Sequence, residues 1–297
     1  MPRVNRKKKI LLALALLLLA GLFFVWAIGT QLIAPYRVNV GAAPAEWHAQ
    51  SVNLASSSGA TLSGWWIPGE PGKGAIILMH GVRSTRLGLT NRIPFLRAAG
   101  YSILLFDFQA HGESGGEHIT YGKLESLDAA AAVEFVKTNA PGERIGVIGA
   151  SLGGAAALLA EPPLPVDALV LESVFPTLQQ ATEDRLAIRF GRTGKCFAPL
   201  LLWQLPLRLG LSAGELKPAE HARSNTLPKL FIAGTADRHT TLAESKALFA
   251  AAAEPKEQWL VEGAAHVDLR SFTRTEYEKR VGDFLRAHLR SSAPPKN

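Results

Sequence analysis

The amino-acid sequence predicts an α/β fold in which a mostly parallel β-sheet is covered by helices on both faces. Short apolar segments alternate along the chain with segments of helical pattern, and this alternation is typical of a parallel sheet. Of the 297 residues, those from 45 to 290 are enough for one such domain with a large core.

The first 33 residues predict a membrane anchor. Five basic residues, Arg3, Arg6, Lys7, Lys8 and Lys9, precede the 19-residue apolar run from Ile10 to Ile28, which approaches the roughly 30 Å of a bilayer's hydrocarbon core. A long signal peptide is the alternative, since Ala27-Ile28-Gly29 has the spacing of a cleavage site, but secretory apolar regions are usually only about 7–15 residues long. Basic residues stay on the cytoplasmic side. We therefore expect a single-pass protein of the cytoplasmic membrane, with its domain on the outer (periplasmic or extracellular) side.

The elements of the domain should begin with two strands of alternating apolar and polar residues, Trp47–Leu54 and Thr61–Pro68. Turn residues at 56–59 separate them, which predicts an antiparallel hairpin at the edge of the sheet. Buried strands should follow at Ile76–Met79, Ser102–Asp107, Ile145–Ile148, Ala168–Leu171, Leu230–Gly234 and Trp259–Val261. Helices are expected at Ile93–Ala99, Leu124–Thr138, Leu152–Ala160 and Thr241–Ala253.

The composition excludes several function classes. Five of the seven net positive charges lie in the first 33 residues, so the rest of the chain carries +2 and gives no basis for nucleic-acid binding. Histidine and cysteine residues lack the spacing of a metal site, and no metal or cofactor is expected. The single cysteine, Cys196, can form no intrachain disulfide. It is not expected to be a nucleophile because it lies outside any strand-to-loop context.

The segment Gly149-Ala150-Ser151-Leu152-Gly153 predicts a nucleophile. It closes a β-branched run and opens a helical one, and a serine on such a sharp strand-to-helix turn adopts strained backbone angles at a cost of about 1–3 kcal/mol. Only small neighbours let the chain bend so tightly, and the two glycines supply that room. The alternative is that Ser151 is an ordinary turn residue.

A serine nucleophile needs a base that takes its proton and an acid that orients the base. Asp237 follows the expected strand Leu230–Gly234, and His266 follows the expected strand Trp259–Val261, which gives the chain order of an α/β-hydrolase sheet. Asp237 is alternatively a turn former that caps the next helix. The competing acid is Glu172, at the end of the preceding strand, and the competing bases are His111, His118 and His239.

Two backbone N–H groups are expected to bind the oxyanion of a tetrahedral intermediate. The first belongs to Leu152, directly after the proposed nucleophile. The second belongs to Val82, in the small-residue loop that leaves the strand Ile76–Met79. His80 and Gly81 are expected to shape this loop rather than to react.

These residues resemble the motifs of the α/β-hydrolase family, in particular of small bacterial esterase-like and peptidase-like members with His-Gly after the third strand. The loop from Asp107 to Ser114 resembles the family's Asp-x-x-Gly-His-Gly-x-Ser loop, although Gln109-Ala110 stands where Arg-Gly is usual. The turn Asp237-Arg238-His239-Thr240 also departs from many relatives, which have proline or valine there. The resemblance extends from about residue 50 to about residue 288 and implies the hydrolase fold and its serine chemistry.

An insertion of about 175–218 separates the strands Ala168–Leu171 and Leu230–Gly234. Its run Phe197–Leu207 is too short to span a bilayer and too apolar to face water freely. We interpret the insertion as a helical cap over Ser151, in which Leu202 and Trp203 bind the substrate and favour acyl chains of short to medium length. The alternative is that these residues pack against the sheet as ordinary core.

The sequence therefore indicates a membrane-anchored serine hydrolase that cleaves small-molecule carboxylic esters through an acyl-enzyme. An exopeptidase or amidase of the same fold is the alternative, although no cap residue stands out as the charged group that would hold a substrate terminus. A non-catalytic binding protein is a third interpretation, because fold does not dictate function. Residues 291–297 are expected to form a disordered tail.

Overall fold

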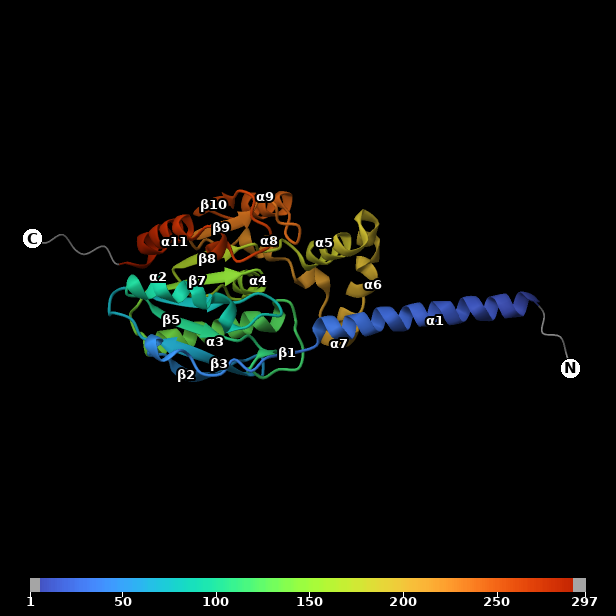
Figure 1. Ribbon diagram of the computed structural model, residues 1–297, viewed down its shortest axis with the longest axis horizontal. Coiled ribbons are helices and arrows are strands. Elements are labelled where there is room, and N and C mark those ends of the chain that lie inside the picture. The colour runs from blue at the N-terminus through green and yellow to red at the C-terminus, as the bar shows by residue number, and fades with distance from the viewer. Residues whose placement is uncertain (1–5, 291–297) are drawn as a thin grey trace, which may run out of the picture.

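An eight-stranded sheet forms the centre of the computed structural model, which describes residues 6–290 (Figure 1). The strand order is β10-β9-β8-β7-β4-β5-β3-β2, and within the described residues β3 alone runs against the other strands of this sheet. The strands are β2 (Gln50–Ala55), β3 (Thr61–Ile67), β4 (Ala75–Met79), β5 (Ser102–Phe106), β7 (Ile145–Ala150), β8 (Ala168–Glu172), β9 (Lys229–Gly234) and β10 (Lys256–Val261). The predicted, mostly parallel sheet is confirmed. Arg3 and the predicted tail at 291–297 lie outside the described residues.

Helices cover both faces of the sheet because its central strands are apolar on both sides. In β4, alternate residues enter two separate core clusters, with Ile77 in one and Ile76 in the other. The first cluster is covered by α3 (Lys123–Asn139), α4 (Leu152–Leu159) and α9 (Leu242–Ala251). The second is covered by α2 (Ile93–Ala98), α10 (Leu269–Phe272) and α11 (Arg274–Leu289).

The structure departs from the predicted elements in a few places. β2 begins at Gln50 rather than Trp47, because Ala45–Trp47 forms a 3₁₀ turn (η1) and His48 takes the left-handed conformation. The sequence analysis did not identify α11, which buries Tyr277, Val281, Phe284, Leu285 and Leu289 along one face. It also missed a two-residue parallel pair, β1 (Tyr36–Arg37) with β6 (His111–Gly112), which joins the chain after the N-terminal helix to the loop around His111.

The chain between β8 and β9 leaves the sheet and forms a set of short helices, here called the cap. The cap comprises α5 (Leu178–Phe190), η3 (Arg192–Phe197), α6 (Ala198–Leu202), α7 (Leu205–Leu209) and η4 (Ala213–Glu215). The chain then returns through α8 (Pro218–Ala222), in which Ala222 is fully buried.

The N-terminal helix α1 (Arg6–Ile33) projects from the domain beside the cap (Figure 1). Its 28 residues correspond to a length of about 42 Å. It is long and apolar enough to cross a membrane, and the side chains of its apolar window are exposed. Contacts between α1 and α6 link this helix to the cap.

Candidate active site

Ser151 occupies the sharp turn between β7 and α4. Its φ is +49°, a conformation that non-glycine residues rarely adopt. A Cβ atom at Gly153 would lie 2.1 Å from the carbonyl oxygen of Met79, and one at Gly149 would lie 2.6 Å from the nitrogen of Gly154. The small residues on both sides of Ser151 are therefore required by close backbone contacts, as the sequence pattern predicts.

Asp237 and His266 form a hydrogen-bonded pair at the carboxyl ends of β9 and β10. Oδ2 of Asp237 lies 2.7 Å from Nδ1 of His266, and Oδ1 accepts backbone N–H groups from His239 and Thr240. Burial alone would raise the pKa of Asp237, but the hydrogen bond from His266 and those from the two backbone groups lower it below its ordinary value. Asp237 is thus ionised at neutral pH, and Nε2 of His266 is the ring nitrogen left free of this pair.

Glu172, the competing acid, has other partners. Its carboxylate pairs with Arg92 at 2.6 Å and accepts the hydroxyl of Tyr277. Arg92 is fully buried and also pairs with Asp268 at 2.5 Å. Both oxygens of Glu172 are therefore engaged in a buried network, and among the described residues Asp237 is the carboxylate that contacts His266.

The competing histidines also have other surroundings. His111 is buried, its Nδ1 donates to the carbonyl of Gln109, and its Nε2 accepts the N–H of Arg83. Both ring nitrogens are therefore hydrogen-bonded to backbone groups. His118 is exposed and lines neither cavity that contains Ser151. His239 packs against His266 with ring centroids 5.1 Å apart, but its imidazole has no hydrogen bond to a carboxylate in residues 6–290.

Two cavities meet at Ser151 and Val82. The polar cavity has a volume of about 420 Å³ and is lined by His266, His239 and Arg92 among others. The apolar cavity, about 490 Å³, lies under the cap and also contains Leu152. Both volumes fall in the range of ligand sites, roughly 300–1,000 Å³. The structure thus brings together Ser151, His266, Val82 and Leu152, the residues that the sequence proposes for nucleophile, base and oxyanion donors.

The loop that carries Val82 is held in place by buried polar contacts. His80 donates through Nδ1 to the carbonyl of Gly81 and accepts the N–H of Phe108 through Nε2 at 3.0 Å. Burial, together with nearby His111, lowers the pKa of His80 to about 3, so it is neutral. Asp107 accepts the backbone N–H of Arg86 at 2.7 Å and pairs with its guanidinium. As the sequence analysis expects, His80 shapes this loop.

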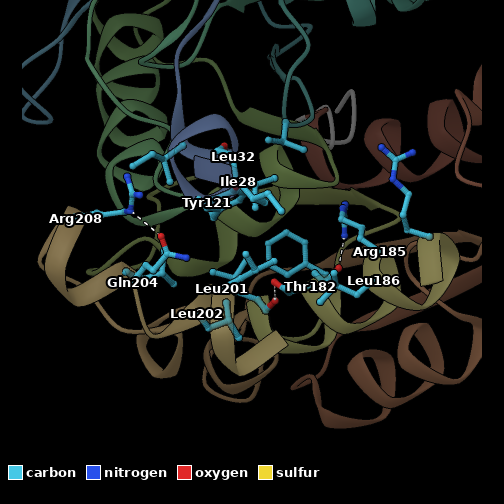
Figure 2. Close-up of a pocket in the computed structure, with 18 of the residues that line it drawn as sticks. Ile28, Leu32, Tyr121, Thr182, Arg185, Leu186, Leu201, Leu202, Gln204 and Arg208 are labelled. Atoms are coloured by element: carbon cyan, nitrogen blue, oxygen red, sulfur yellow. Dashed lines mark hydrogen bonds between the residues drawn. The ribbon is translucent and has the colours of Figure 1, made fainter. Parts of the chain in front are cut away.

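The apolar cavity has walls that the sequence analysis predicted only in part (Figure 2). Leu202 lines it, but Trp203 does not: its ring packs on Trp26 of α1, with centroids 6.4 Å apart. The prediction that Trp203 binds the substrate is therefore corrected, because α1 occupies the side of the cap to which Trp203 turns. In its place, Ile28 and Leu32 of α1 and Arg185 of α5 belong to the lining.

No pattern in the sequence distinguishes these lining residues. Hydropathy predicts that α1 is long and apolar enough to cross a membrane, but it does not tell what the helix contacts. Among residues 6–290, no group of three or more histidine, cysteine, aspartate or glutamate side chains is arranged to hold a metal ion.

Known proteins are similar to this chain in sequence and in fold. Residues 70–206 match the family described as serine aminopeptidase, S33. The chain is 30% identical to the uncharacterised protein Rv2307c of Mycobacterium tuberculosis over 83% of each chain. It is 27% identical to the uncharacterised protein YqkD of Bacillus subtilis over 78% of this chain and 77% of that protein. Among solved structures, the Pyrococcus furiosus esterase Pf2001 is similar, with 28% identity, a TM-score of 0.70, and coverage of 86% of this chain and 99% of the esterase.

Proposed function

The chain belongs to the α/β-hydrolase family, and on that premise we propose that it is a membrane-anchored serine hydrolase that cleaves carboxylic esters through an acyl-enzyme. The observation that carries the proposal is the hydrogen-bonded pair of Asp237 and His266, whose histidine lines the polar cavity together with the strained Ser151. A strained serine beside a histidine that is oriented by a carboxylate is the arrangement that activates a hydroxyl for acyl transfer.

In the proposed reaction, Nε2 of His266 accepts the proton of Ser151 as Oγ attacks the ester carbonyl. The backbone N–H groups of Leu152 and Val82 hold the resulting oxyanion, and the ionised Asp237 stabilises the imidazolium. The imidazolium then gives its proton to the departing alkoxide, which is released as an alcohol. The acyl group stays bound to Oγ of Ser151. Water then attacks the acyl carbon as His266 takes one of its protons; the bond to Oγ breaks, the acid is released, and His266 returns the proton to Ser151.

The match to a serine aminopeptidase family makes an exopeptidase the alternative. An aminopeptidase needs a carboxylate that is free to bind the ammonium group of its substrate. No carboxylate lines the apolar cavity, and in the polar cavity Glu172 and Asp268 are both paired with Arg92. The similarity to an esterase and this lack of a free carboxylate in the described lining support an ester as the substrate.

We propose that α1 is retained as the anchor and that the domain lies outside the cytoplasmic membrane. Retention is supported by the last turns of α1, which are held to the domain: the carbonyl of Leu32 accepts the hydroxyl of Tyr121, and the carbonyl of Ile33 accepts the N–H of Ile119, each at 2.8 Å. The basic residues before Ile10 support the orientation. Protease added to intact spheroplasts should digest the domain, and protection there would contradict this orientation.

The catalytic proposal is tested by fluorophosphonate labelling of the full-length protein, Ser151→Ala, and Ser245→Ala as the control. Ser245 is a buried serine in α9 that lines neither cavity and whose hydroxyl has no hydrogen-bond partner. The wild type and the control should be labelled and should hydrolyse p-nitrophenyl acetate, whereas Ser151→Ala should do neither. Turnover of aminoacyl anilides but not of esters would favour the exopeptidase. Equal labelling of Ser151→Ala would refute the nucleophile.

A further inference from the structure

We propose that the substrate is the acyl ester of a membrane lipid, which reaches Ser151 directly from the bilayer and places its acyl chain between α1 and the cap. This inference rests on the proposed ester hydrolase. It adds the class of substrate and the route by which the substrate arrives.

The apolar cavity is built partly from the membrane helix itself. Ile28, Leu32 and Phe24 of α1 line it together with Leu201 and Leu202 of α6, and Ser151 lies in the same cavity (Figure 2). A chain that fills this space therefore contacts α1 on one side and the cap on the other, and it leads to the proposed nucleophile. A helix that served only as a tether would have no reason to form a wall of this cavity.

The position of α1 against the cap is fixed by specific contacts. The side chain of Gln204 is buried and donates to the carbonyl of Val25 at 3.1 Å. The guanidinium of Arg208 stacks on the ring of Trp26 at 3.7 Å. A Cβ atom at Gly29 would lie 2.3 Å from Oε1 of Gln204, so a glycine there lets the two segments approach closely. The wall formed by α1 is thus a packed interface.

The mouth of the cavity lies at the depth of a bilayer leaflet. Phe24 and Phe190 both line the cavity, yet they are 65% and 59% exposed, so the cavity reaches the surface between α1 and α5. At 1.5 Å per residue, Phe24 lies about 21 Å along the helix from Ile10, where the apolar run begins. In a hydrocarbon core of roughly 30 Å, this is about 9 Å inside the outer boundary. An acyl chain of the outer leaflet therefore meets the opening without passing through water.

The outer surface of the cap suits contact with a bilayer. Phe190, Phe197, Leu200, Trp203 and Leu207 are between 43% and 66% exposed, and they make up five of the eight large apolar side chains exposed in residues 34–290. From residue 185 to 214 the chain has five basic residues and no acidic one. Apolar side chains among basic ones are typical of segments that lie in the interface of a membrane with anionic lipids. The segments Arg192–Leu209 and Ala213–Ala222 together are also apolar enough to enter a membrane, although the chain bends by 90° between them.

The two cavities separate the two halves of such an ester. The apolar cavity takes the acyl chain, and the polar cavity, which contains His266, takes the alcohol with its head group. Arg185 lines both cavities and has no carboxylate partner in the described structure. It is therefore placed to contact a polar or anionic group close to the reacting ester bond.

The proposal is tested with a fluorophosphonate that carries a photoreactive diazirine at the end of a dodecyl chain, added to the full-length protein in lipid nanodiscs. Oγ of Ser151 attacks the phosphorus, fluoride leaves, and the hydroxyl proton passes to His266. Light then converts the diazirine to a carbene that inserts into the nearest residue. We expect adducts within Phe24–Ile33 of α1, found by peptide mass spectrometry. Adducts confined to the sheet or to its loops would overturn the proposal.

Ser151→Ala serves as the control, because any adduct formed without attachment to Ser151 reports only free probe dissolved in the bilayer. Adducts on α1 that are equally abundant in this variant would likewise overturn the proposal. If the wild type is not labelled at all, it is the proposed hydrolase function that fails.

A second measurement uses the matched variants Ile28→Trp and Leu18→Trp in nanodiscs. Ile28 lines the cavity, whereas Leu18 lies on the same helix, is 65% exposed and contacts neither cavity. We expect Ile28→Trp to lower kcat/KM for p-nitrophenyl dodecanoate by about tenfold or more and to change that for the acetate by less than about twofold, since only the long chain reaches position 28. Leu18→Trp should change neither. If the ratio of kcat/KM for the dodecanoate to kcat/KM for the acetate is the same in Ile28→Trp as in the wild type, the proposed binding site for the acyl chain is refuted.

The route from the bilayer has its own test. A fluorescent lipid ester placed in the same vesicles as the protein should be hydrolysed faster than the same ester in separate vesicles. Equal rates in the two arrangements would show that the substrate arrives through water.

Discussion

Exchange of Asp237 for asparagine should lower turnover by several orders of magnitude while the fold survives, and the structure specifies why. Oδ1 of Asp237 accepts two backbone N–H groups, from His239 and Thr240, so the oxygen of an asparagine must occupy that position. The amide nitrogen then faces Nδ1 of His266, which lies 2.7 Å from Oδ2 in the wild type. The imidazole must accept this N–H at Nδ1 and carry its own proton on Nε2. In that tautomer Nε2 cannot take the proton of Ser151.

The expected loss is about 10³–10⁴ in kcat, which corresponds to roughly 4–5.5 kcal/mol of activation free energy. Stability should fall by only about 1–2 kcal/mol, because the two backbone hydrogen bonds persist and lose only their assistance by charge. The assay is steady-state hydrolysis of p-nitrophenyl acetate, combined with thermal unfolding of the same preparations.

Glu172→Gln is the matched control, because it makes the same chemical change in the carboxylate at the end of the neighbouring strand. It leaves the fully buried Arg92 with Asp268 as its remaining charged partner, and loss of one partner of a buried pair costs about 3–5 kcal/mol. At about 2–4 °C per kcal/mol, Tm should fall by roughly 6 °C or more while kcat stays within about tenfold of the wild type. If Glu172→Gln lost more activity than Asp237→Asn, the acid would be misassigned.

Three further predictions follow from single contacts. Gly153→Ala should destabilise the protein by about 1–3 kcal/mol and reduce activity, because the new methyl group meets the Met79 carbonyl. Its control is Gly282→Ala in α11, which has open space around it and should stabilise the protein by about 0.5–1 kcal/mol. Equal effects of the two substitutions in urea unfolding would contradict this prediction. Burial alone would raise the pKa of Asp268, but Arg92 lowers it to about 2. The ionised carboxylate therefore contributes about 2 kcal/mol to the free energy of unfolding, a contribution that is complete above pH 3.8 and is lost as the pH falls toward 2. The difference in unfolding free energy between wild type and Asp268→Asn should shrink over that range, and a constant difference would refute the assignment. Arg185→Gln should lower kcat/KM about tenfold for an anionic monosuccinate ester and less than about twofold for a neutral butyrate; a uniform loss would mean that Arg185 has only a structural role.

The elements around Ser151 could be predicted because their signals are local. A turn that demands small residues on both sides of a serine leaves its mark within five positions, and parallel strands bring residues after different strands to one edge of the sheet. The same rule could not choose between Asp237 and Glu172. Asp237 follows β9 and Glu172 is the last residue of the neighbouring strand β8, so both lie at the same edge. The choice depends on Arg92 and Tyr277, which come from positions 80 residues before and 105 residues after Glu172.

The role of the cap was less accessible to sequence reasoning for a different reason. An apolar run such as Phe197–Leu207 shows that side chains must leave water, but not whether they contact core, substrate, lipid or another helix. Leu202 faces the cavity, whereas its neighbour Trp203 contacts Trp26. The difference of one position around a helix turn is enough to move a side chain from one environment to the other.

The contact between Gly29 and Gln204 gives a second meaning to the sequence pattern that first suggested a signal peptide. The spacing Ala27-Ile28-Gly29 fits a cleavage site, and its glycine also fits a helix that approaches the cap closely, because a Cβ atom at position 29 would lie 2.3 Å from Oε1 of Gln204 and that side chain would have to move. Cleavage there would remove Phe24 and Ile28 from the cavity and free the carbonyl of Val25 from its hydrogen bond. The glycine near the end of α1 is thus accounted for by packing against Gln204. On this account the anchor and the substrate site are one structure, and a chain without α1 would lack a wall of the cavity that leads to Ser151.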